Sequence, residues 1–80
     1  MTARIIVTPR KDIRDPQGSA VRHALETLGY REARDVRIGK YIEVKLEGAD
    51  RAAAEERVRD MCEKLLANTI IEDYRFELSE

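Results

Sequence analysis

The sequence predicts an α+β fold for residues 1–80, taken as one domain, in which two helices pack on an antiparallel sheet. Two observations predict it. Two segments alternate apolar and polar side chains with a period of two, which is typical of strands that bury one face, and a third is rich in β-forming residues. Two other segments carry apolar residues at helical spacing, and an aspartate precedes each of them as an N-cap. The expected order of elements is β-α-β-α-β.

The first strand is expected at Ala3–Thr8, a run rich in β-branched residues. The first helix is expected from about residue 16 to residue 28. Asp15 suits its N-cap, Pro16 suits its first position, and Gly29 suits a left-handed C-cap. The inward-facing side chains of this helix are expected to be Val21, Ala24, Leu25 and Leu28.

The longest strand is expected at Asp35–Glu47, and the other elements are expected to be organised around it. Lys40 is the one exception on its apolar face, and it follows Gly39. A Gly-Lys pair also suits the type II′ turn of a hairpin, but a hairpin would divide the aliphatic side chains between two faces. We therefore favour one strand that is bent or bulged at Gly39. The aliphatic residues of one parity are Val36, Ile38, Ile42, Val44 and Leu46.

This strand is too long for its own domain. It would span about 40 Å at roughly 3.3 Å per residue, whereas a chain of this size has a radius of gyration of about 12 Å. The overhanging part would expose unpaired backbone groups, which another chain can cover. The sequence therefore predicts a subunit of an assembly.

The second helix is expected to begin after the N-cap Asp50 and to stop near Asn68, and the last strand is expected at Ile70–Leu78. If the long strand bends at Gly39, its halves count as two strands. The order then approximates the βαββαβ of a ferredoxin-like fold, with two helices on one antiparallel sheet. The inward-facing side chains of the second helix are expected to be Ala54, Val58, Met61, Cys62 and Leu65.

Composition excludes several classes of protein. Fifteen Lys and Arg against sixteen Asp and Glu give a net charge of −1, which argues against a nucleic-acid-binding protein. A single cysteine excludes an internal disulfide and a multi-cysteine zinc site. No apolar run approaches the ~20 residues of a membrane span, and no secretory h-region opens the chain. We expect a cytoplasmic protein that binds neither nucleic acid nor a membrane.

The sequence offers no catalytic constellation, and we expect no catalytic, cofactor or metal site. His23 lies away from the apolar stripe of the first helix, so it faces solvent or a partner. Cys62 lies on a buried stripe and is expected to be a small core residue. Lys40 is either a snorkelling surface lysine or a charge for a carboxylate or phosphate of another chain. The basic loop of Arg10, Lys11 and Arg14 is either solvated or contacts an acidic partner.

Three segments closely resemble the PurS family, the small subunit of phosphoribosylformylglycinamidine synthase. They are DPQGSAVRHALETLGY (15–30), VRIGKYIEVKL (36–46) and MCEKLLANTIIEDYRFEL (61–78), and the match runs from the first strand to the last. The clearest departure is the loop Pro9–Arg14, where many relatives carry a glycine-containing turn.

The resemblance implies a role in the fourth step of de novo purine biosynthesis, in which formylglycinamide ribonucleotide, ATP and glutamine give formylglycinamidine ribonucleotide. It implies a subunit without catalytic residues, which joins a large synthetase subunit, the user of ATP and magnesium, to a glutaminase subunit. It also implies a homodimer formed through the long bent strand of the sheet, or a dimer of dimers. From exposure and position, partner contacts are expected at Arg37, Lys40, Tyr41, Arg22 and His23.

Two other classes of function compete. An ACT-like small-molecule regulatory domain shares the expected fold, and it would change its melting temperature on binding an amino acid or a nucleotide. An RNA-binding plait would need aromatic side chains on its central strands, where only Tyr41 is expected.

Overall fold

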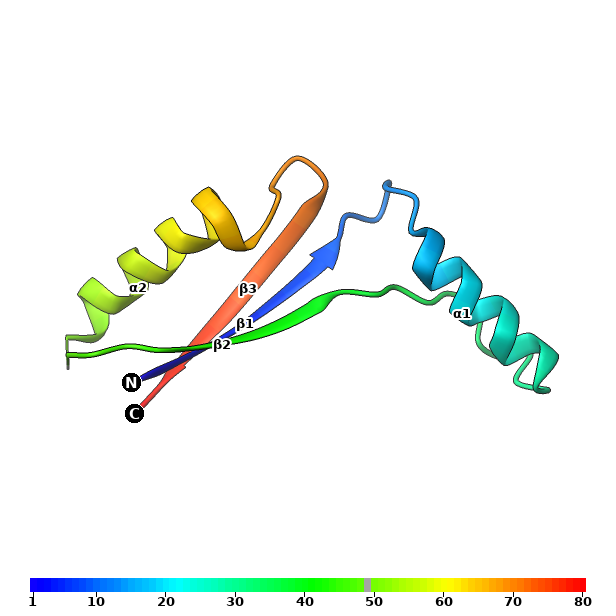
Figure 1. The fold of residues 1–80 in the computed structure, drawn as a ribbon, viewed down its shortest axis with the longest axis horizontal. Coiled ribbons are helices and arrows are strands. Elements are labelled where there is room, and N and C mark those ends of the chain that lie inside the picture. Colours follow the sequence, from blue (N-terminus) through cyan, green and yellow to red (C-terminus); the bar gives the residue numbers. More distant parts are fainter. Residues whose placement is uncertain (49) are drawn as a thin grey trace.

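In the computed structural model, which describes residues 1–48 and 50–80, the elements follow the predicted order and form an α+β fold (Figure 1). The helix α2 continues into a π-helical turn at Cys62–Leu66. The predicted fold class is thereby confirmed. The bounds of the elements are β1 Thr2–Pro9, α1 Pro16–Thr27, β2 Lys40–Lys45, α2 Arg51–Met61 and β3 Glu72–Ser79.

The strand β1 is the centre of the sheet, since the strand order is β2-β1-β3 and both pairings are antiparallel. Ala3, Ile5 and Val7 lie on one face of β1 and are fully buried. The expectation that the long strand organises the chain is wrong in this respect, because β2 lies at an edge. Alternation of side chains identifies a half-buried strand, but it does not say how many neighbours that strand has.

One face of the sheet is covered by α2 and its π-helical turn. Val58 and Cys62 are fully buried and pack in one cluster with the core face of β1. Leu65 was expected to point inward, but it is 82% exposed, and Leu66 packs against the core instead. The prediction for Leu65 is wrong because the π-turn inserts an extra residue and rotates the following side chains around the helix axis.

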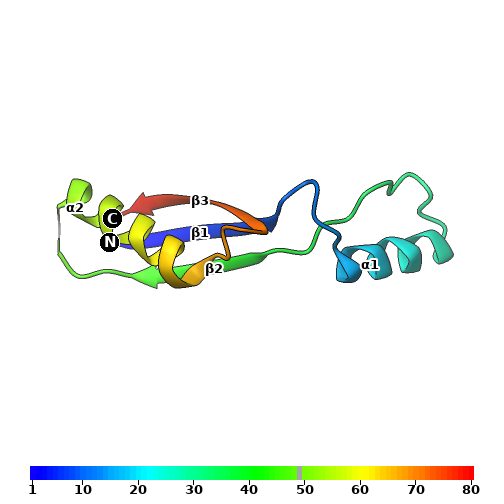
Figure 2. The same cartoon turned by 90° about the horizontal axis from the view of Figure 1, so that it is seen from above.

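The helix α1 lies beyond the end of the sheet, on the far side from α2 (Figures 1 and 2). The molecule is accordingly long and flat, 49 × 26 × 14 Å, with a radius of gyration of 16.0 Å against the roughly 12 Å of a compact chain of this size. The expectation that two helices pack on the sheet is met within one chain by α2 alone. Both caps of α1 are as predicted, with Asp15 at the N-cap and Gly29 at φ 101°.

The long strand is only partly paired. Lys40–Lys45 forms a ladder with β1, whereas residues 32–39 are assigned to no strand and run back along α1 (Figure 2). The hairpin alternative is wrong, because the residues after Gly39 pair with β1. A Cβ atom at Gly39 would lie 2.2 Å from the Val7 carbonyl oxygen, so glycine is required here for the close approach of two backbones.

Candidate subunit interface

The outer edge of β2 is unpaired in the part of the chain that the structure describes. Met1 and Leu46 exchange backbone hydrogen bonds in both directions, which fixes the alternation of the antiparallel ladder. Tyr41, Glu43 and Lys45 are the residues of the opposite parity. Their backbone N–H and C=O groups therefore point away from β1, toward the free edge. This edge can accept another strand.

The apolar stripe of α1 is not covered by its own chain. Val21 is 40% exposed and Leu28 is 72% exposed, and Leu25 is half-buried. Tyr30, in the turn that follows the helix, is also exposed. An amphipathic helix is stabilised when its apolar side is buried against another surface. Nothing in the described part of this chain buries it.

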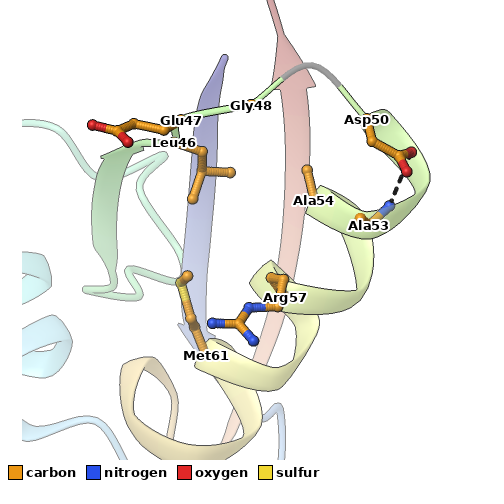
Figure 3. A pocket seen from close by; sticks show the side chains of 8 residues that line it. All are labelled: Leu46, Glu47, Gly48, Asp50, Ala53, Ala54, Arg57 and Met61. Carbon is orange, nitrogen blue, oxygen red and sulfur yellow. Dashed lines mark hydrogen bonds between the residues drawn. The ribbon is translucent and has the colours of Figure 1, made fainter.

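An apolar groove runs between α2 and β2 (Figure 3). It consists of two adjoining pockets of about 330 Å³ and 470 Å³, which share Arg57 and Met61. Leu46 and Met61 face each other across it, and the Arg57 side chain lies over its middle (Figure 3). Ile42, Val44 and Leu46 on β2 are only half-buried. The groove exists because α2 leaves part of the core face of β2 uncovered.

The position of α1 is fixed by Asp15 and Gly18. The Asp15 carboxylate accepts a hydrogen bond from Gly18 N at 2.9 Å and from Ile38 N at 2.7 Å, so it ties the first turn of α1 to the returning chain. The Ile38 and Gly18 amides hold the pKa of Asp15 below its usual range, and the charge of Arg37 acts in the same direction. Gly18 is buried, and a Cβ atom there would lie 2.0 Å from the Val36 carbonyl oxygen.

Arg37, a predicted partner contact, is used within the chain. Its Nη1 donates to the carbonyl oxygens of Arg10 (3.0 Å) and Ile13 (2.9 Å), and its Nη2 donates to the carbonyl of Lys11. Arg10 in turn donates to Thr69 O at 2.6 Å. These bonds fix the conformation of the loop between β1 and α1, in which the sequence departs from the resemblance. They leave the Arg37 guanidinium little capacity to bind another chain.

The other predicted partner contacts fall into two separate places. Lys40 begins β2, and its Nζ lies 3.9 Å from Glu72 Oε2. Tyr41 follows on the sheet face opposite α2 and is 58% exposed. Arg22 and His23 lie on α1, where Nη1 of Arg22 lies 3.3 Å from Glu26 Oε2. Lys40 and Tyr41 are therefore neighbours on β2 whose side chains lie on opposite faces of the sheet, and Arg22 and His23 lie apart from both on α1.

The titratable side chains among the described residues are of two kinds, those free of metal-like clusters and those used in the fold. No three His, Cys, Asp or Glu side chains among them gather closely enough to hold a metal ion. Cys62 is fully buried, and burial raises the pKa of its thiol, which disfavours the nucleophilic thiolate. Tyr74 donates to Glu63 Oε2 at 2.7 Å, a bond between β3 and the π-turn that raises the pKa of Tyr74 to about 12. No helix in this part of the chain is long and apolar enough to cross a membrane.

Sequence reasoning missed the groove and the second bond of Asp15. The N-cap role of Asp15 was visible as Asp-Pro, but its bond to Ile38 joins residues far apart in the sequence. The sequence partly indicated the groove. The apolar stripes of α1 and α2 and the apolar face of β2 together present more apolar surface than one sheet of this size can cover. The exposed Leu65 could not be placed there before the π-turn was known.

Comparison with known proteins gives a consistent result. Residues 2–80 match the family model described as PurS, phosphoribosylformylglycinamidine (FGAM) synthase. The phosphoribosylformylglycinamidine synthase subunit PurS of Bacillus subtilis is 53% identical over 77 residues, which cover 96% of this chain and 90% of the relative. The structure of B. subtilis PurS superposes with a TM-score of 0.89 at 52% identity, covering 99% of this chain and 98% of the other. The structure of PurLQS from Thermotoga maritima contains a chain with a TM-score of 0.83 at 30% identity, covering 95% of this chain and 94% of that one.

Proposed function

Because this chain belongs to the PurS family, we propose that it is the small, non-catalytic subunit of a phosphoribosylformylglycinamidine synthase complex and that it joins the glutaminase and synthetase subunits. The complex uses ATP and glutamine to convert formylglycinamide ribonucleotide to formylglycinamidine ribonucleotide in purine biosynthesis. The chain acts in the cytoplasm. ATP and magnesium bind to the synthetase subunit, and this chain binds no cofactor.

The observation that carries this proposal is the incompleteness of the single chain. It presents a free sheet edge, an unpacked helix stripe and an open apolar groove, and none of these forms a chemical site. Surfaces of this kind bind other proteins. An ACT-like regulatory domain is not favoured, since the family match covers residues 2–80.

The first partner is a second copy of this chain. The outer edge of β2 has no paired strand in the described residues, and residues 33–39, which precede β2, belong to no strand and lead from α1 to the sheet (Figure 2). A strand paired on this edge would satisfy the outward backbone groups of β2. We therefore favour a homodimer built through the sheet; dimers can pair further into a dimer of dimers.

A bridging subunit contributes to the reaction by fixing the relative position of the glutaminase and synthetase active sites. Ammonia released from glutamine must reach the synthetase site before it is lost to water, so the two active sites must be held in a defined orientation. A small subunit does this by supplying interface area. Lys40 and Tyr41, neighbouring exposed residues of β2 that face opposite sides of the sheet, are the proposed contacts with the larger subunits, and Arg22 and His23 are proposed as a second contact on α1.

The experiment is a reconstitution of the purified synthetase and glutaminase subunits with and without this chain. Turnover is measured with glutamine and, separately, with ammonium salts, which bypass the glutaminase. Bridging predicts that omission of the chain abolishes the glutamine-driven rate but leaves the ammonia-driven rate. Loss of both rates on omission would instead assign the chain a role in the chemistry of the synthetase, and unchanged rates would refute the proposal.

The contact residues are tested by combining Lys40→Glu with Tyr41→Ala. The double variant is expected to lower the glutamine-driven rate and to elute apart from the larger subunits. Arg31→Glu, an exposed charge reversal in the turn after α1, is the matched control and is expected to behave as the parent. Full assembly and activity of the double variant would refute the assignment of these two contacts.

A further inference from the structure

We propose that the outer edge of β3 pairs with the same edge of a second copy, in antiparallel register and with Phe76 opposite Phe76. This contact is separate from the proposed homodimer, which uses the β2 edge on the other side of the sheet. It rests on the proposed function only in giving the dimer of dimers a surface through which two dimers meet. Three features of β3 carry it: the free backbone groups of its edge, the charges on its open face and the side chains that pack toward α2.

The outward backbone groups of β3 belong to its even-numbered residues. The odd-numbered residues of β1 bond to β2, in the same phase as the Met1–Leu46 pair, so its even-numbered residues bond to β3. In the register of β1 with β3 these residues lie opposite the odd-numbered residues of β3. Tyr74, Phe76 and Leu78 therefore direct their N–H and C=O groups away from β1, at the outside of the sheet (Figure 2).

The chain itself caps both ends of this edge. At one end Glu72 N donates to the Asn68 carbonyl oxygen at 2.7 Å, and at the other end Arg51 Nη2 donates to the Leu78 carbonyl oxygen at 3.1 Å. The middle of the edge is open. Within the described residues, the outward groups left without a partner are the N–H and C=O of Tyr74, the N–H and C=O of Phe76 and the N–H of Leu78.

These free groups favour a pairing centred on Phe76. In that register Phe76 exchanges two hydrogen bonds with Phe76 of the other copy, and Tyr74 of each chain pairs with Leu78 of the other. All the free groups are then used, and the Leu78 carbonyl has a second lone pair for the Tyr74 N–H. A pairing centred on Tyr74 would instead require the Glu72 N–H, which already donates to the Asn68 carbonyl.

The charges on the open face of the sheet favour the same register. Asp73, Arg75 and Glu77 are exposed and alternate in sign. With Phe76 at the centre, Arg75 of each copy lies opposite Glu77 of the other, which gives two pairs of opposite charge. A pairing centred on Arg75 or on Glu77 would place like charges directly opposite each other, which destabilises a strand pair. The edge is therefore self-complementary, as a two-fold contact between identical chains requires.

The side chains toward α2 are held in place before any contact forms. The Arg59 guanidinium lies over the Phe76 ring, 5.6 Å from its centre, and the Tyr74 hydroxyl donates to Glu63 at 2.7 Å. Both rings are half-buried against the core. Pairing centred on Phe76 would bring the two Phe76 rings together and set Tyr74 beside Leu78 of the other copy. Side chains that are already ordered lose little entropy on association.

The first experiment is a charge exchange in the otherwise unchanged chain. Arg75→Glu and Glu77→Arg each turn both cross-strand pairs into repulsions, so each is expected to raise the dissociation constant between dimers at least about tenfold by sedimentation. The double variant restores opposite charges and is expected to return to within about threefold of the parent. Asp73→Lys is the matched control and is expected to stay within about twofold, because Asp73 faces Ser79 in this register. Circular dichroism first checks the fold of each variant.

The second experiment follows the backbone itself by hydrogen exchange and NMR. Arg75 and Glu77 bond to β1, so their amides are expected to stay protected at every protein concentration. Tyr74, Phe76 and Leu78 are expected to gain protection as the concentration rises and to lose it on dilution. In the Arg75→Glu variant, the amides of these three residues are expected to exchange fast at all concentrations.

The outcomes separate this contact from the other proposals. A double variant that associates as weakly as the single ones overturns the pairing of Arg75 with Glu77. A strong effect of Asp73→Lys with none of Glu77→Arg overturns the register centred on Phe76. A parent that never exceeds a dimer, with Tyr74 and Phe76 amides unprotected, overturns pairing at β3 and keeps the homodimer through β2. The bridging role fails or holds independently, in the glutamine-driven rate of the reconstitution.

Discussion

At the scale of single residues, one carboxylate determines where the first helix lies. The Asp15 carboxylate caps α1 by accepting from Gly18 N, and it also accepts from Ile38 N. The residue that marks the start of α1 in the sequence therefore also sets the direction in which α1 and the returning chain extend from the sheet. Gly18 allows this arrangement because any larger side chain would meet the Val36 carbonyl. The exposed arm thus depends on a small polar junction and not on a hydrophobic core.

The junction predicts a pH dependence. The pKa of Asp15 is lowered in the folded chain, chiefly by its bond from Ile38 N, relative to 3.8 for the free group. The unfolded chain therefore binds the proton first as pH falls. The stabilisation by Asp15 is complete well above pH 3.8 and is lost as pH falls through the lower, folded value. Asn also caps helices, so Asp15→Asn removes the charge and keeps the cap.

Chemical unfolding at a series of pH values between about 3 and 6 measures this effect. The parent is expected to lose stability toward the acid end more steeply than Asp15→Asn. Asp12→Asn, an exposed change in the same loop, serves as the control and should follow the parent. Identical slopes for the parent and Asp15→Asn would show that the two backbone bonds do not favour the ionised carboxylate.

At the scale of elements, local sequence signals predicted where the helices and strands lie better than they predicted which elements pack against each other. Pro16 and Gly29 mark the ends of α1 through the backbone angles they adopt, and the structure places both as predicted. Leu65 could not be placed in this way. The π-turn lies where the end of α2 meets β3, and there the Tyr74 hydroxyl donates a hydrogen bond to Glu63. No local residue pattern predicts such a turn.

The π-turn gives two neighbouring leucines different roles, which can be measured. Leu66 packs against the core, so Leu66→Ala is expected to lower the free energy of unfolding by about 2 kcal/mol. Leu65 is exposed in the single chain, so Leu65→Ala should cost less than about 0.5 kcal/mol in dilute solution while weakening association. Urea titrations of both variants provide the comparison. A regular α-helix through Leu65 would reverse the order.

At the scale of the whole molecule, the elongated shape explains why the sequence misled about the centre of the sheet. Val36 and Ile38 continue the apolar alternation of β2, which made Asp35–Glu47 look like the most complete strand. In one chain that run is an unpaired arm followed by an edge strand, and β1 takes the centre. The alternation marks side chains suited to burial, yet one chain leaves Ile38 39% exposed. A sequence pattern does not say how much of that burial its own chain provides.

The free edge of β2 allows the assembly to be followed one amide at a time. Ile42 and Val44 have the parity that bonds to β1, so their amide hydrogens should exchange slowly at every protein concentration. Tyr41, Glu43 and Lys45 direct their N–H groups outward and gain partners only when another strand pairs with this edge. Hydrogen exchange followed by NMR is therefore expected to show protection at these three odd positions that falls on dilution, while the two even positions remain protected. Slow exchange at Tyr41 and Glu43 in a sample shown to be monomeric would mean that their own chain covers this edge, and the strand-paired dimer would then lose its basis.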